Sequence, residues 1–175
     1  MKRKIISLLL AAAMALTVSA AALTPADFSG GALSGVAADG GALLVTDTFN
    51  KVVWRVEDGE VSRFAGQISV PGLDGEPIGK YDDGTLSTAL FMEPWAIAPF
   101  LDGWAVSDAA ANVIRYIDSS GVRTAAGSGK AGGADGVAER VSFDYPTGLT
   151  AGITENCISP TPATAPSAEW TPRAR

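Results

Sequence analysis

The sequence contains no histidine and a single cysteine, Cys157, among its 175 residues. Without histidine the chain lacks the usual zinc ligand, the usual general base and any Ser-His-Asp triad. Without a second cysteine no disulfide can form within the chain, so stability must come from packing. The lack of histidine favours a non-catalytic protein and leaves an enzyme as the less favoured alternative.

Basic residues are also few, with 13 Lys and Arg against 19 Asp and Glu and a formal charge of −6. Three of the basic residues lie at positions 2–4, so the chain without them carries a formal charge of about −9. Phosphate binding depends on basic patches. We therefore expect no nucleic-acid partner.

The N-terminal segment, positions 1–22, has the pattern of a secretory signal peptide. Lys2, Arg3 and Lys4 precede an uncharged, mostly apolar run at positions 5–18, and small residues follow. The run is shorter than the roughly 20 apolar residues of a membrane-spanning helix. We expect cleavage after Ala22, export to the cell envelope or medium, and no membrane association afterwards.

No long stretch after Ala22 keeps a helical period, and 20 glycines and 10 prolines separate many short apolar runs. This composition predicts an all-β fold. Positions 43–46 and 52–56 are β-branched and aromatic runs on either side of a polar turn, and therefore predict a β-hairpin. A second copy occupies positions 103–118, with Val113 in the place of Val52. Two copies of one unit indicate a repeat architecture.

The repeat extends beyond the hairpins. A third strand ending in Ala-Gly follows each of them at the same offset, and a Gly-rich loop then leads to Asp83-Gly84 and Asp135-Gly136. Each loop precedes a Phe-x-x-Pro segment, at positions 91–94 and 143–146, and these segments lie closer together than the hairpins because the first loop is the longer. Gly84 and Gly136 are expected to supply positive φ. A weaker copy at positions 33–37 suggests a strand from an earlier repeat.

Positions 28–151 resemble the NHL-repeat β-propellers, whose repeat combines these strands with an Ala-Gly-x-Gly-x-x-Asp-Gly loop before Phe-x-x-Pro. The resemblance implies four-stranded blades around a central channel, usually six in a closed ring. One departure occurs in the turn, where the second copy has Ala111 in place of Asn50 and an asparagine, Asn112, at the next position.

Two sets of polar residues are candidate site residues. Asp47, Asn50, Asp108 and Asn112 lie in the hairpin turns, where Asx side chains commonly bind backbone N–H groups, so we assign them structural roles. The long first loop could bind a partner or be a tolerated surface insertion. Its candidate partner-binding residues are Asp74, Glu76, Tyr81 and Asp82.

No cofactor is expected. Carboxylates of the Gly-rich loops could bind calcium, but their spacing is not that of a regular calcium loop, so solvated charges are the favoured interpretation. The leading functional hypothesis is a binding or scaffold module of an exported propeller, with an unknown protein or carbohydrate ligand. The alternative is a fragment of a propeller enzyme, of lyase or lactonase type, whose catalytic blades are absent.

Positions 23–151 provide about two blades with flanking strands, which is too few to close a ring. An open arc exposes blade edges and faces, so we expect the chain to be unstable alone or to self-associate. A compact, cooperatively melting monomer in size-exclusion chromatography would contradict this expectation.

The tail, positions 152–175, is rich in Pro, Thr and Ala and lacks the blade pattern. Two interpretations fit it, a disordered linker and the next hairpin in a shifted reading frame. The genetic code permits Gly-Lys-Leu-Tyr-Ile-Ser-Asp-Thr-Gly-Asn-Ser-Thr-Ile-Arg-Arg-Met-Asp in that frame, and this peptide follows positions 41–57 one by one. The nucleotide sequence decides between the two interpretations.

Overall fold

The computed structural model describes residues 31–68, 73, 78–151 and 158–162. This part of the chain is all β, apart from the short 3₁₀ helix η1 (Ala138–Arg140). None of its helices is long and apolar enough to span a membrane. The predicted signal peptide, at positions 1–22, and the loop residues Asp74 and Glu76 lie outside the described residues.

The first sheet contains β1 (Leu33–Asp39), β2 (Ala42–Asp47), β3 (Val52–Glu57) and β4 (Glu60–Ala65), in that spatial order and antiparallel throughout. The prediction that positions 33–37 belong to an earlier blade is wrong, because β1 pairs directly with β2. The two strands are joined by a tight turn in which Gly40 adopts a φ of 57°. The first blade therefore already has four strands.

The second sheet repeats the first with β5 (Pro94–Phe100), β6 (Gly103–Asp108), β7 (Val113–Asp118) and β8 (Gly121–Ala126). Each of its strands begins at the same sequence offset from its counterpart in the first sheet. The irregularity is repeated too, because the register shifts between Leu33 and Val36 in β1 and between Pro94 and Ile97 in β5. The two sheets are therefore copies of one unit down to a β-bulge.

A third, two-stranded sheet pairs β9 (Pro146–Ala151) with β10 (Ile158–Pro162). β9 begins at Pro146 as β5 begins at Pro94, which is where the sequence repeat predicts the first strand of a further blade. β10 lies within the tail predicted to be a linker or a frameshifted segment. The rest of that tail lies outside the described residues, so both interpretations remain predictions.

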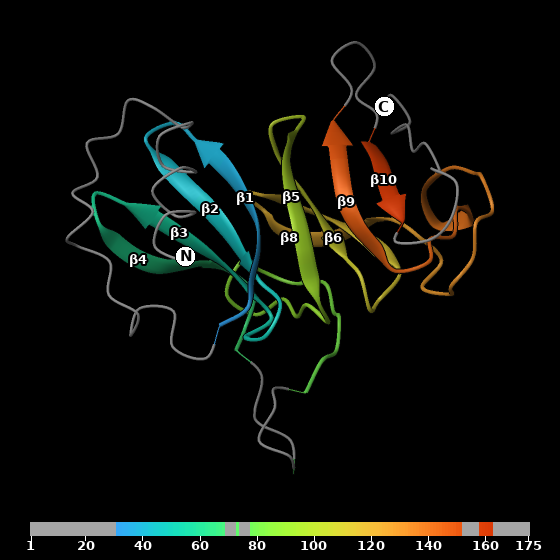
Figure 1. Cartoon of the computed structure of the whole chain (residues 1–175), viewed down its shortest axis with the longest axis horizontal. Coiled ribbons are helices and arrows are strands. Elements are labelled where there is room, and N and C mark those ends of the chain that lie inside the picture. The colour runs from blue at the N-terminus through green and yellow to red at the C-terminus, as the bar shows by residue number, and fades with distance from the viewer. Residues whose placement is uncertain (1–30, 69–72, 74–77, 152–157, 163–175) are drawn as a thin grey trace, which may run out of the picture.

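The innermost strands of the three sheets are neighbours. β1 lies beside β5 and β5 beside β9, and the remaining strands extend away from them (Figure 1). Close approach at the first junction needs Gly35, because a Cβ there would lie 2.5 Å from the Trp95 carbonyl oxygen. Thr46 joins the same strands, since its hydroxyl accepts from the Gly35 N–H at 2.7 Å and donates to that carbonyl at 2.6 Å.

The core consists of two apolar clusters that alternate with the sheets. One lies between the first and second sheets and includes Leu44, Val53, Phe91, Val106 and Ile117. The other lies on the opposite face of the second sheet and includes Ala105, Ile114, Tyr116, Val141 and Phe143. Neighbouring strand residues face opposite sides, so the second sheet buries both its faces. Two stacked four-stranded antiparallel sheets of this kind fit the blades of a partial β-propeller.

Gly84 and Gly136 do not have the positive φ expected from the sequence. Gly84 is required for close contact instead, because a Cβ there would lie 2.8 Å from the Thr88 hydroxyl oxygen. Its backbone forms a bridge to Val122 at the edge of β8. The left-handed glycines that open the two loops are Gly66 and Gly127, with φ values of 95° and 109°.

Candidate functional site

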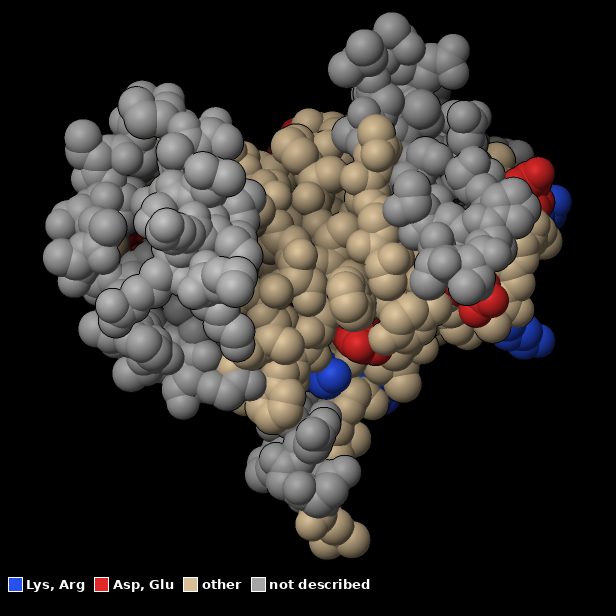
Figure 2. Space-filling view, viewed as in Figure 1, with Lys and Arg blue, Asp and Glu red and all other residues tan. Residues whose placement is uncertain are grey.

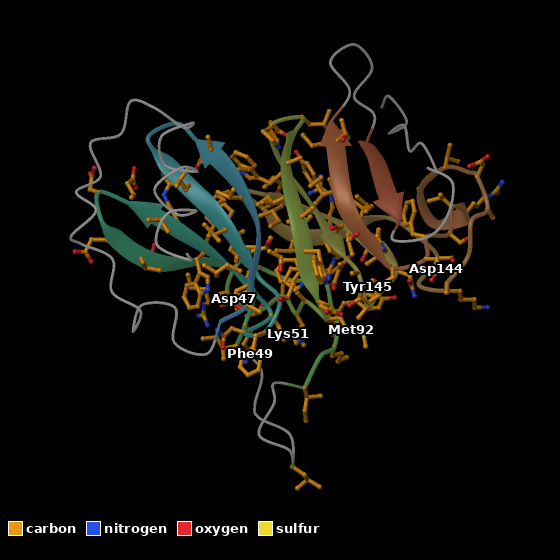
Figure 3. The ribbon with its side chains drawn as sticks, in the orientation of Figure 1. Asp47, Phe49, Lys51, Met92, Asp144 and Tyr145 are labelled. Carbon is orange, nitrogen blue, oxygen red and sulfur yellow. The ribbon has the colours of Figure 1, made fainter. Side chains whose placement is uncertain are left out.

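The ends of the inner strands form the candidate functional site. The turns that follow β2 and β6 lie at the same end of the sheets as the segments that lead into β5 and β9 (Figure 3). We call the outer residues of these segments the rim, namely Phe49, Lys51, Met92, Glu93, Asp144 and Tyr145. On the face drawn in Figure 2, the described surface above this end is largely uncharged, and acidic and basic side chains adjoin at its lower margin.

Asp47 ends β2 and is completely buried. Its carboxylate accepts hydrogen bonds from the backbone N–H groups of Ala32 (3.1 Å), Phe49 (3.1 Å) and Asn50 (3.0 Å), and from the side chains of Asn50 (2.7 Å) and Trp54 (2.9 Å). Burial raises the pKa of this carboxyl, but the hydrogen bonds from Asn50 and Trp54 outweigh burial and hold the pKa below its ordinary value.

Asp108 occupies the same place in the second blade and is also completely buried. It accepts from the backbone N–H groups of Met92 (3.0 Å) and Glu93 (2.6 Å), and a guanidinium nitrogen of Arg115 lies 3.7 Å away. Burial raises the pKa of Asp108 above its ordinary value, although these hydrogen bonds and the Arg115 charge oppose the increase. Each aspartate thus ties its hairpin turn to the segment that enters the same blade.

The two turns share one backbone shape despite their shifted asparagines. Lys51 and Asn112 occupy equivalent positions and both adopt left-handed conformations, with φ values of 62° and 55°. Asn50 binds Asp47 within its own blade. Asn112 instead accepts from the backbone N–H of Tyr145 at 2.9 Å, so it connects the second blade to the segment before β9. The departure that the sequence shows at Ala111 changes the partner of the asparagine and leaves the turn itself intact.

The rim presents aromatic and charged groups together. Tyr145 is 36% exposed, and its ring meets that of Trp95 edge-on at 6.5 Å between centroids. Burial and a hydrogen bond with Glu93 raise the pKa of the Tyr145 phenol. The nearby Trp95 indole N–H acts in the opposite direction and lowers the pKa of Tyr145. The Trp95 indole nitrogen is buried, and no hydrogen bond with normal geometry reaches it from the described residues. Phe49 and Lys51 are half-buried, and Asp144 is exposed.

The candidate partner loop is anchored to the second blade at its C-terminal end. Tyr81 is 37% exposed, and the guanidinium carbon of Arg115 lies 5.6 Å from the centre of its ring. Asp82 pairs through its backbone with Leu90, and its exposed carboxylate lies 3.2 Å from the Lys80 ammonium. The side chain of Asp82 therefore faces solvent while its backbone packs. Binding by this loop remains a prediction.

Arg115 is the buried polar residue that the sequence analysis missed. Its side chain has no exposed surface, and it donates to the carbonyl oxygens of Leu90 and Asp82 and to the Asp83 carboxylate, each at 2.9 Å. The Phe91 ring centre lies 5.4 Å from the guanidinium carbon. An arginine inside the apolar run at positions 113–117 was the available signal, because a buried charge requires such partners.

Asp83 is the loop carboxylate that holds Arg115. The same oxygen accepts from the backbone N–H of Thr124 at 2.9 Å and from its hydroxyl at 3.0 Å. Across the described ranges, no group of three or more acidic, histidine or cysteine side chains is placed to hold a metal ion. Calcium binding stays an untested prediction.

No family model matches the chain, and no curated protein matches it. It is similar to the solved structure of a protein of unknown function from Bacteroides thetaiotaomicron, with 21% identity and a TM-score of 0.55 over 70% of this chain and 30% of that one. It also matches the solved structure of a catalytically inactive virginiamycin B lyase from Staphylococcus aureus with quinupristin. The identity is 15% and the TM-score 0.43, over 87% of this chain and 44% of that one.

The chain thus spans less than a third of the first structure and less than half of the second. At these identities a likeness concerns the fold alone. The first similarity agrees with the two-blade architecture described above.

Proposed function

We propose that this chain is a non-catalytic binding segment of an exported β-propeller protein, and that the rim binds carbohydrate. One observation carries the proposal: the buried carboxylates beneath the rim are occupied by the fold, while the outward-facing groups are aromatic and charged. Asp47 accepts five hydrogen bonds, and Asp108 is bound by backbone N–H groups beside Arg115. Neither is free to act as a general base.

The outward-facing groups suit sugar rings. Tyr145 and Phe49 offer apolar ring surface, while Lys51, Asp144 and the Tyr145 hydroxyl offer hydrogen bonds. Ligand sites commonly combine aromatic walls with a few placed polar groups. Trp95 lies against Tyr145, so ligand stacking on Tyr145 should change tryptophan emission.

Tryptophan fluorescence of the chain from position 23 to 175 provides the test, with cello-, chito- and xylo-oligosaccharides as probes and calorimetry for affinity. We expect at least one probe to change the emission, and Tyr145→Ala and Phe49→Ala each to weaken its binding tenfold or more. Leu101→Ala, at the exposed turn between β5 and β6, should bind normally. If no saccharide binds, or if both rim variants bind as the parent does, the carbohydrate proposal is wrong.

A further inference from the structure

The two Gly-rich loops fold alike although the first is the longer. The first two backbone N–H groups of each loop donate to backbone carbonyls near its end. In the first loop, Gly66 donates to Leu86 and Gln67 donates to Ala89. In the second loop, Gly127 donates to Ala138 and Ser128 donates to Val141. The pairing of Leu90 N–H with the Asp82 carbonyl also recurs, between Ser142 N–H and the Ala134 carbonyl. Asp135 therefore has the same local setting as Asp83.

In the first loop this setting forms a cradle for a guanidinium group. The Leu90 and Asp82 carbonyls and the Asp83 carboxylate accept from Arg115, and Phe91 lies against its charge. Arg115 comes from the third strand of the blade that follows this loop. The cradle thus fixes the loop to its own following blade, with Gly84 bridged to Val122 on the fourth strand.

The second loop carries the same groups. Its counterparts are the Ser142 and Ala134 carbonyls, the Asp135 carboxylate and the Phe143 ring. Asp135 is exposed, and within the described residues no hydrogen bond or ion pair engages its carboxylate. Arg55, Arg115 and Arg123 are already bound to Asp39, Asp83 and Asp118. Arg63 and Arg140 are described too, and neither forms an ion pair with Asp135, although Arg140 lies beside Gly136. The described part of the chain therefore supplies no arginine to this second cradle.

We propose that Asp135, with Ala134, Ser142 and Phe143, is a docking site for a third blade that begins with β9 and carries an arginine on its third strand. A second copy of the chain fits poorly. Its first blade has Trp54 at the position of Arg115, hydrogen-bonded to Asp47, and its second blade keeps Arg115 on its own Asp83.

The occupant is the hairpin that the shifted reading frame permits after β9. In the shifted frame, the last base of the Ser167 codon and the first two of the Ala168 codon permit Arg, Gly, Ser or Cys. An arginine there would stand at the same spacing from the hairpin aspartate of that peptide as Arg115 does from Asp108. The carboxylate of Asp135 and the guanidinium of such a blade would form the pair that Asp83 and Arg115 form one repeat earlier. The inference does not depend on carbohydrate binding, because none of the four cradle residues belongs to the rim.

The test compares Asp83→Ala with Asp135→Ala in two chains, the present one and one with the frame restored near codons 151–153. Asp83→Ala should lower the melting temperature of both by about 4 °C or more. Asp135→Ala should lower the melting temperature of the present chain by no more than about 1 °C. In the restored chain it should lower the melting temperature as much as Asp83→Ala does. Asp144→Ala, an exposed neighbour, is the control.

Four outcomes would overturn the proposal. The shifted frame could stop before the arginine or encode another residue there. Asp135→Ala could leave the restored chain unaffected. It could destabilise the present chain as Asp83→Ala does, which would mean that the cradle is already filled. Finally, size-exclusion chromatography could show a dimer of the present chain that Asp135→Ala dissociates, which would make a second copy the occupant.

Discussion

The two blades hold equivalent buried aspartates by different means. In the first, Asp47 is bound by hydrogen bonds alone, with the Trp54 indole N–H supplying the donor from the third strand at 2.9 Å. In the second, Arg115 stands in the place of Trp54, 3.7 Å from Asp108. The pKa shifts have opposite directions, lowered for Asp47 and raised for Asp108. One backbone therefore accommodates either a neutral or a charged partner for its carboxylate.

The exchange of Trp54 for Arg115 also changes how the blade contacts the loop that precedes it. Arg115 also binds two carbonyls and the Asp83 carboxylate, so the second blade is joined to the loop that precedes it. Trp54 donates to Asp47 within its own blade. Replacing the Arg115 side chain should therefore affect loop and blade together, whereas replacing Trp54 should affect one turn.

Arg115→Ala is predicted to lower the free energy of unfolding most, by about 3 to 5 kcal/mol, because it leaves Asp108 buried without its charged partner. Trp54→Phe removes one of the five donors to Asp47 and should cost about 1.5 kcal/mol. Arg55→Ala, which breaks partly exposed ion pairs to Asp39 and Glu57, is the control and should cost under about 1 kcal/mol. Urea unfolding followed by circular dichroism measures all three. Equal losses for Arg115→Ala and Trp54→Phe would remove the contrast between the blades.

Ile114→Ala should come next, at roughly 2 to 4 kcal/mol, because its side chain is completely buried between the second and third sheets. Val53, its counterpart, is equally buried but one methylene smaller, so Val53→Ala should cost about 1 kcal/mol less. Asp82→Ala, on the exposed loop, should cost under about 0.5 kcal/mol. The same unfolding experiment compares them, and similar losses for Ile114→Ala and Asp82→Ala would refute the strand placement.

The repeat made the hairpins and their constant spacing predictable, because strand and turn residues recur at fixed offsets. It did not reveal that positions 33–37 complete the first blade, since that segment lacks the proline that marks β5. The role of Arg115 was also hidden, because its acceptors are mostly backbone carbonyls contributed by a loop that precedes it in the chain. Side-chain identity alone does not encode such partners.

Acid should weaken the first blade through Asp47. Its folded-state pKa lies below the unfolded value of about 3.9, so its stabilisation is present above that pH and is lost as pH falls through the folded pKa. Asp47→Asn should cost about 1.5 to 3 kcal/mol at pH 7, and the difference from the parent should shrink below about pH 4. Ser120 and Arg123 lower the pKa of Asp118 to about 2. Protonation of Asp118 therefore destabilises the parent and the Asp47→Asn variant alike in the same pH range, and it does not contribute to the difference between them. Melting temperatures from pH 2 to 7 test this, and a pH-independent difference would contradict it.

The smallest predicted effects concern the left-handed residues Lys51 and Asn112. A side chain other than Asn or Asp is strained there by about 1 kcal/mol, and glycine relieves the strain. Lys51→Gly should therefore be more stable than Lys51→Ala by about that amount, and this pair is matched because both variants lose the same charge near Asp108.

Asn112 should respond differently, because asparagine tolerates the left-handed conformation and its side chain also accepts from the Tyr145 N–H. Asn112→Gly loses only the hydrogen bond, at about 1 kcal/mol, and Asn112→Ala loses the bond and gains the strain, at about 2 kcal/mol. Lys51→Gly should thus equal or exceed the parent in stability while Asn112→Gly falls below it, in the same urea titrations. If Asn112→Gly were as stable as the parent, the bond to Tyr145 would contribute nothing to holding the second blade against the segment that leads into β9.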